Sequence, residues 1–131
     1  MTIKLFLDDE RPAPAGFFQY TSGEDLITYM INYPLGFAGT VDVLSIDHDL
    51  GDGMSGYDTI KKIVNDYPSI IDNIDEICIH SNNTVGRENI KQYLINAQEN
   101  NVISSSLKIY PNYLQYNDGC LYDTVTGEKL Y

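Results

Sequence analysis

Acidic side chains crowd two short segments that each follow an apolar run. The segment SIDHDLGDGMSG, residues 45–56, contains three aspartates and a histidine, and Asp8 and Asp9 follow a second apolar run near the N-terminus. Mutual repulsion and desolvation make such crowding unfavourable unless positive charge lies among the carboxylates. A divalent cation would supply that charge. The carboxylates expected to hold it are Asp8, Asp9, Asp47 and Asp49.

The residue types narrow the identity of this cation without fixing it. Mg²⁺ and Mn²⁺ prefer the oxygen atoms of carboxylates and water, and they are the ions that we expect most. A histidine beside an aspartate would also admit iron or zinc. The sequence therefore predicts a divalent metal ion and leaves the choice among these metals open.

The two histidines and two arginines of the chain lie near the same segments. His48 lies between two aspartates, His80 begins the polar segment HSNN, and Arg11 closely follows the first acidic pair. Arg87, the amide of Asn82 and the N-terminus of the following helix are suited to binding an anion, phosphate above all. A histidine titrates near neutral pH and can move protons during phosphoester cleavage. The expected catalytic residues are His48, His80 and Asp47, and Arg11, Asn82 and Arg87 are expected to bind substrate.

Each of these features also has a purely structural explanation. Two aspartates shortly before a proline are common in a solvated loop, and Asn82-Asn83 is common in a turn. A histidine at the end of a buried strand, such as His80, is often a hydrogen-bonded structural residue. The tyrosines of the C-terminal segment could stack on a nucleobase, but hairpin tyrosines more often pack across the strands.

The elements that must position these residues alternate between strand and helix. Apolar runs and helical spacing predict strands at residues 3–7, 17–20, 41–46 and 74–79 and helices following residues 21–24, over 57–67 and over 85–97. This order predicts an α/β fold in which a parallel sheet has helices on both faces. Ligands bind such sheets at the carboxyl ends of the strands, where every polar segment named above lies.

The chain length and the C-terminal pattern bound the domain organisation. A chain of 131 residues fits one domain, residues 1–131. Beyond Ser104 the turn signals Asn117-Asp118-Gly119 and Thr126-Gly127-Glu128 predict a strand and a β-hairpin, which form an extension over about residues 105–131.

Composition excludes several classes of partner. A net charge of -11 argues against unassisted binding of long DNA or RNA, which depends on lysine and arginine. A small nucleotide or the phosphate at an RNA end is the expected ligand. No apolar stretch approaches the ~20 residues needed to span a bilayer, and we expect a cytoplasmic protein without membrane contact. The two cysteines form no zinc or disulfide pattern, and the composition leaves the oligomeric state open.

Several motifs resemble a known family. LFLDD and VDVLSID resemble two strands of the response-regulator receiver domain, which carry an acidic pair and a phosphoacceptor aspartate; Asp8, Asp9 and Asp47 match these positions. More closely, LFLDDERP, SIDHDLG and HSNNTVGRENI together resemble the cyclic-phosphate processing receiver-like family, which is proposed to act on cyclic phosphate ends of nucleotides or RNA. The resemblance reaches from residue 5 to about 90 and implies a three-layer receiver-like (flavodoxin-like) fold.

The resemblance also implies roles for two further positions. Ser81 falls where receivers keep a phosphate-binding hydroxyl, and Asp49 falls where receivers supply a backbone carbonyl to the metal. Receivers have a lysine followed directly by proline at the end of their fifth strand, whereas this chain has Lys108-Ile109-Tyr110-Pro111. This departure argues against conventional phosphorelay signalling.

Three functions remain open at this point. The first is a metal-dependent phosphoesterase that opens a cyclic phosphate of a nucleotide or RNA end. The second is a switch in which Asp47 becomes an aspartyl phosphate and the surface repacks for a partner. The third is a module that binds a nucleotide without turning it over.

Overall fold

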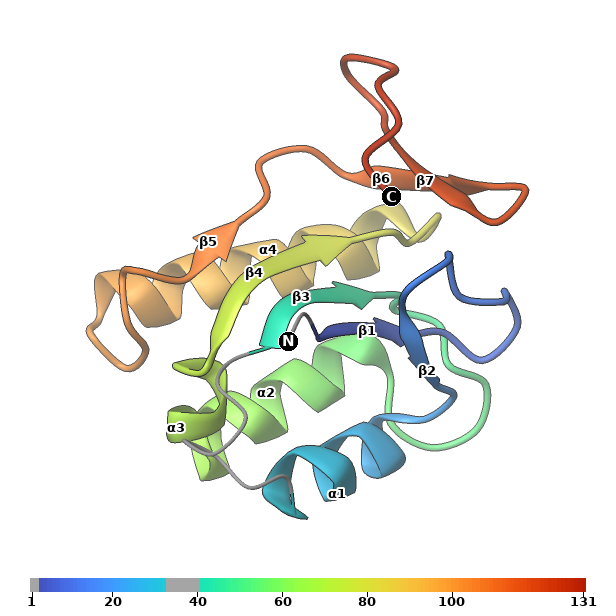
Figure 1. Ribbon diagram of the computed structural model, residues 1–131. Helices are drawn as coiled ribbons and strands as arrows, with labels where there is room; N and C mark the ends of the chain where they lie inside the picture. The colour runs from blue at the N-terminus through green and yellow to red at the C-terminus, as the bar shows by residue number, and fades with distance from the viewer. Residues whose placement is uncertain (1–2, 33–40) are drawn as a thin grey trace.

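A five-stranded parallel sheet forms the centre of the molecule (Figure 1). The structure is a computed structural model that describes residues 3–32 and 41–131. The strand order is β2-β1-β3-β4-β5. The strands are β1 (Lys4–Leu7), β2 (Phe18–Tyr20), β3 (Val41–Ile46), β4 (Ile74–Ile79) and β5 (Lys108–Ile109). The strands predicted at residues 41–46 and 74–79 therefore have the expected bounds.

The helices lie on one face of this sheet. They are α1 (Gly23–Asn32), α2 (Gly56–Asp66), the short α3 (Pro68–Ile71) and α4 (Thr84–Glu99). Apolar residues of all four pack in one core cluster with alternate residues of the central strands, such as Leu5, Leu44 and Ile77. The crossovers from β2 to β3, β3 to β4 and β4 to β5 all run in the same direction along the sheet. Since parallel crossovers are right-handed, their helices must lie on the same face.

The opposite face is covered by an antiparallel hairpin. Strands β6 (Leu114–Asn117) and β7 (Cys120–Asp123) pair through a turn at Asp118 and Gly119, which both have positive φ. Leu114 and Leu121 of this hairpin pack on Phe6, Val43 and Cys78, the strand residues that point away from the helices.

The receiver-like fold class and the C-terminal hairpin are thus confirmed, but the distribution of helices differs from the prediction. We expected helices on both faces, and the described helices occupy one. The connection from β1 to β2, residues 8–17, runs along the other face and contains Pro12, Pro14 and Gly16, which disfavour a helix. The hairpin therefore covers a face that would otherwise expose Phe6 and Val43.

The start of each long helix near the strand ends is fixed by a side-chain cap. Ser55 and Asp58 form a capping box at the start of α2, and Asn83 accepts a hydrogen bond from the backbone N–H of Gly86 (2.8 Å) at the start of α4. Pro68 ends the α2 segment, as expected, and also begins α3. Among the described helices, none has both the length and the apolar character required to cross a membrane.

Candidate functional site

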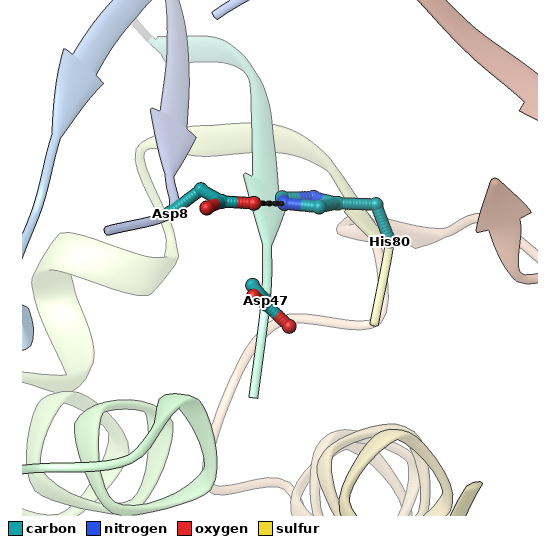
Figure 2. Close-up of side chains that lie close together, drawn as sticks. All are labelled: Asp8, Asp47 and His80. Carbon is teal, nitrogen blue, oxygen red and sulfur yellow. Dashed lines mark hydrogen bonds and ion pairs between the residues drawn. The ribbon is translucent and has the colours of Figure 1, made fainter. Parts of the chain in front are cut away.

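The register of the three central strands brings their carboxyl ends to the same level. Leu7 pairs with Ile46, and Ile46 pairs with Ile79. The next residue of each strand is polar: Asp8, Asp47 and His80. One carboxylate oxygen or ring nitrogen from each lies within 4.8 Å of the others (Figure 2). The predicted meeting of residues distant in the chain therefore occurs.

Asp8 and His80 form a buried pair. His80 Nε2 lies 3.0 Å from Asp8 Oδ2, and His80 Nδ1 lies 2.6 Å from the Ser45 hydroxyl. The imidazole stacks on Phe6 with 4.4 Å between ring centroids. Burial is the main cause that lowers the pKa of His80, so the ring is neutral near pH 7. Because a carboxylate only accepts, Nε2–H donates to Asp8 and Nδ1 accepts from Ser45.

The other oxygen of Asp8 is also occupied. Asp8 Oδ1 accepts hydrogen bonds from the backbone N–H groups of Glu10 and Arg11, both at 2.9 Å. Burial by itself raises the pKa of Asp8, but the hydrogen bonds from His80, Arg11 and Glu10 outweigh it and leave the pKa lowered. Asp8 is therefore a charged anchor that fixes the turn after β1.

A pocket of about 410 Å³ opens beside this pair at the strand ends. Among the residues that the structure describes, the pocket is lined by residues of the loops after β1, β3 and β4: Asp9, Glu10, Arg11, Asp47, Asp49, Gly51 and Asn82. Four of these carry carboxylates and one carries a guanidinium, which gives the wall a formal excess of three negative charges when all are ionised. The carboxylates offer oxygen atoms as metal ligands, and these are the ligands that Mg²⁺ and Mn²⁺ prefer.

Asp47 is the buried carboxylate of this pocket. Burial is the largest cause that raises its pKa, and the nearby charge of Asp8 adds to it. A hydrogen bond with the Ser81 side chain acts in the opposite direction. A cation in the pocket would stabilise the ionised form of Asp47, so the residues present fit a divalent metal ion.

Two glycines shape the loop that follows Asp47. Gly51 has φ +70°, and a Cβ there would lie 3.0 Å from Asp9 Oδ2. A Cβ at Gly56 would lie 2.1 Å from the Asp47 carbonyl oxygen, too close for any side chain. The loop can therefore close tightly under the pocket only with glycine at position 56.

The loops after β3 and β4 are joined across the pocket. The side-chain amide of Asn83 donates to Asp49 Oδ1 (3.3 Å), while its oxygen caps α4. Asp49 is therefore held by the start of a helix that follows a different strand.

His48 and Arg87 do not line the pocket. A Cβ at Gly86 would lie 2.2 Å from His48 Cγ, which shows that the His48 ring lies against the first turn of α4. His48 Nδ1 is buried and has no hydrogen-bond partner among the described residues. Arg87 donates from Nη1 to the carbonyl of Ser81 (3.4 Å), and its guanidinium lies over the ring of Tyr113, with Cζ 4.4 Å from the centroid.

The predicted site residues thus fall into three groups. The first group lines the pocket: Asp9, Arg11, Asp47, Asp49 and Asn82. The second group forms buried hydrogen bonds next to the pocket: Asp8 with His80, and Ser81 with Asp47. The third group, His48 and Arg87, lies outside the pocket.

Sequence reasoning missed Ser45, Glu10 and Gly51. The signal for Ser45 was its polar side chain inside the apolar run VDVLSI, and Glu10 adjoins the acidic pair. Gly51 offered only its place between the aspartates of the second acidic segment.

The comparison with protein families gives one match. A family model described as cyclic-phosphate processing receiver domain matches residues 3–96. No curated protein and no solved structure matches the chain. The matched segment contains every residue that lines the pocket and ends within α4, so β5 and the hairpin lie outside it.

Proposed function

Because the chain belongs to the cyclic-phosphate processing receiver domain family, we propose that it is a metal-dependent phosphoesterase. Its substrate would be the cyclic phosphate of a nucleotide or of an RNA end. The observation that carries this proposal is the pocket at the strand ends, where carboxylates from two loops face Arg11 and Asn82.

The lining carboxylates would hold the metal ion in this proposal. Asp9, Asp47 and Asp49 are the proposed ligands, since Asp8 already accepts hydrogen bonds at both oxygens. A bound Mg²⁺ or Mn²⁺ would polarise the phosphate and lower the pKa of a water molecule. Asp8 and His80 then act as positioning residues, because they fix the turn that carries Asp9.

Arg11 and Asn82 would bind the phosphate oxygens. A guanidinium and an amide are the two hydrogen-bond donors of the pocket wall that suit a phosphodiester. Hydrolysis forms one bond from a water oxygen to phosphorus and breaks the bond from phosphorus to a ribose oxygen, which takes up a proton. Both ring nitrogens of His80 are engaged and His48 lies outside the pocket, so this proton would come from water that enters the pocket, which also takes up the proton released by the attacking water.

The test is the hydrolysis of 2′,3′-cyclic AMP in the presence of Mg²⁺ or Mn²⁺, followed by ³¹P NMR of the nucleotide. We expect conversion to a monoester by the wild type and none by Asp47→Asn. Asp118→Asn is the matched control, because asparagine tolerates the positive φ of that hairpin turn and Asp118 lies outside the pocket. A wild type that shows no turnover with either metal would contradict the proposal.

The phosphorylation switch is the second candidate, because the motif around Asp47 resembles the one that carries the phosphoacceptor aspartate of receivers, and Asp47 forms a hydrogen bond with the Ser81 side chain. The lysine that such a switch requires is not at the pocket: Lys108 Nζ lies 3.2 Å from Glu76 Oε2, with its side chain 64% exposed. Incubation with acetyl phosphate followed by intact-mass measurement separates the two functions. A stable phosphate adduct on Asp47 without cyclic-nucleotide turnover would favour the switch, and binding without either product would favour a binding module.

A further inference from the structure

A tyrosine of the C-terminal extension lies against Arg11 of the pocket wall, although the extension falls outside the family match. Arg11 Cζ lies 5.8 Å from the ring centroid of Tyr116, and the Tyr116 hydroxyl donates to the carbonyl of Pro12 (2.7 Å). The same ring lies 6.0 Å from Phe6, which stacks on His80. Arg11 Nη1 also donates to the carbonyl of His80 (3.2 Å) and lies 3.6 Å from Asp8 Oδ2. Tyr116 therefore adds a contact with the guanidinium and a hydrogen bond to the loop that carries Arg11.

The second arginine of the chain is held in a similar way. Arg87 lies over Tyr113, and the Tyr113 hydroxyl donates to Glu88 in the first turns of α4. Lys91 Nζ donates to the carbonyl of Pro111 (2.8 Å). Both arginines of the chain therefore contact a tyrosine of the C-terminal extension, Arg11 through Tyr116 and Arg87 through Tyr113.

The extension is itself firmly attached. The Asp123 carboxylate accepts hydrogen bonds from the Tyr110 hydroxyl (2.6 Å) and the Asn112 amide (2.9 Å), which fixes the segment before the hairpin. The Tyr131 hydroxyl donates to Glu76 on β4 (2.9 Å). A tyrosine on this extension can therefore hold an arginine in one place.

We propose that the C-terminal extension, residues 105–131, is part of the anion site and that Tyr116 is the positioning residue for Arg11. A free arginine side chain samples many rotamers, and fixing it on binding costs conformational entropy. The Tyr116 ring attracts the Arg11 guanidinium and the Tyr116 hydroxyl binds the loop. Together with the His80 carbonyl and the Asp8 carboxylate, Tyr116 holds Arg11 in place before the anion arrives. The identity of the anion as a cyclic phosphate rests on the proposed function, whereas the placement of Arg11 does not.

The first measurement reports the position of Arg11 directly. The chain contains two arginines, so its arginine Nε–Hε NMR spectrum has two signals, which Arg11→Lys and Arg87→Lys assign. Each signal should be shifted by the ring current of the tyrosine beside its guanidinium. We expect Tyr116→Leu to move the Arg11 signal alone and Tyr113→Leu to move the Arg87 signal alone. Tyr122→Leu is the matched control, since Tyr122 lies next to Leu121 on the opposite face of the hairpin.

The second measurement reports the role of Tyr116 in anion binding. Inorganic phosphate is titrated into the Mg²⁺-containing protein while the Arg11 signal is followed. We expect the phosphate affinity to fall about tenfold in Tyr116→Leu and by less in Tyr116→Phe, which keeps the ring. Tyr122→Leu should leave the affinity unchanged. If 2′,3′-cyclic AMP is hydrolysed, Tyr116→Leu should raise KM with little change in kcat, and it should add little to the effect of Arg11→Lys.

The outcomes separate this inference from the proposed function. An Arg11 signal that stays in place in Tyr116→Leu, or phosphate binding equal to that of the wild type, overturns the inference. If Tyr116→Leu loses the hairpin, as judged by its backbone amide signals, Tyr116→Phe decides through the loss of the Pro12 hydrogen bond. A wild type that binds phosphate at Arg11 but never hydrolyses 2′,3′-cyclic AMP contradicts the proposed function and leaves the inference standing.

Discussion

The two faces of the central sheet differ in what they bury. The helix face contains aliphatic side chains from the strands, such as Leu5, Leu44 and Ile77, packed against the helix layer. The hairpin face has a smaller apolar cluster around Phe6. Towards the strand ends this face also buries the connected polar side chains Asp8, Ser45 and His80.

The helix face contributes mainly to stability, and the hairpin face holds the side chains of the candidate site in position. Successive residues of one strand point to opposite faces, so the same strands serve both. The aliphatic face supplies most of the buried apolar area and hence most of the stability. On the hairpin face, burial of polar groups is tolerated because the hydrogen bonds of His80 and Asp8 are made within the protein, and these bonds fix the site.

The largest expected effect comes from comparing the stability contributions of the two faces at two adjacent residues of β3. Leu44→Ala removes a buried side chain from the helix face and should lower the free energy of unfolding by about 2–5 kcal/mol. Val43→Ala on the hairpin face should lower it by about 1.6 kcal/mol, since two carbons are lost at about 0.8 kcal/mol each. Urea denaturation measures both values. A larger loss for Val43→Ala would reverse the assignment of stability to the helix face.

Metal binding tests the site half of the comparison. At a metal concentration of one hundred times Kd, Mg²⁺ or Mn²⁺ should stabilise the protein by about 2.7 kcal/mol. We expect His80→Gln to reduce this increment, because His80 anchors Asp8 and thereby the turn carrying Asp9. Ile63→Val in α2 is the control, and it should lower the baseline by about 0.5–1.5 kcal/mol without changing the increment. Thermal unfolding with and without metal gives both quantities, and an increment unchanged in His80→Gln would contradict the expectation.

The pH dependence of stability should depend on the hairpin face. The folded-state pKa of His80 is lowered below 6.5, mainly by burial, so the unfolded chain takes up the proton first. Its contribution to stability is present above pH 6.5 and is lost as pH falls through the folded pKa. Denaturation in chelator between pH 8 and 5 should show this loss, with a slope of at most about 1.4 kcal/mol per pH unit, and His80→Gln should flatten it. Equal slopes in the two proteins would show that His80 does not govern this range.

The smallest expected effect compares two helix caps. Ser55→Ala and Asn83→Ala should each lower the free energy of unfolding by about 1 kcal/mol, because each cap satisfies a backbone N–H. Asn83 also donates to Asp49, so Asn83→Ala alone should weaken metal binding, as measured by calorimetric titration. Equal metal affinity in the two variants would show that the Asn83 contact does not support the site.

Much of the fold was readable from the sequence because its signals are local. The bounds of β3 and β4 follow from buried runs of β-branched and aliphatic residues, and the hairpin turn follows from Asp118-Gly119. The acidic and polar segments could be placed at one rim because neighbouring parallel strands end on the same side. The sequence therefore determined the layer of strands and the edge of the sheet at which the candidate site lies.

The direction of individual side chains was decided only by the tertiary structure. His80 reaches Asp8 across 72 positions of the chain, and Tyr116 reaches Pro12 across 104. In the sequence, His48 and Arg87 were as good candidates for the site as Arg11 and Asn82. In the structure His48 packs on Gly86 and Arg87 packs on Tyr113. Such contacts depend on strand register and on which segment covers each face, and both are set by packing between residues too far apart for any local pattern to encode.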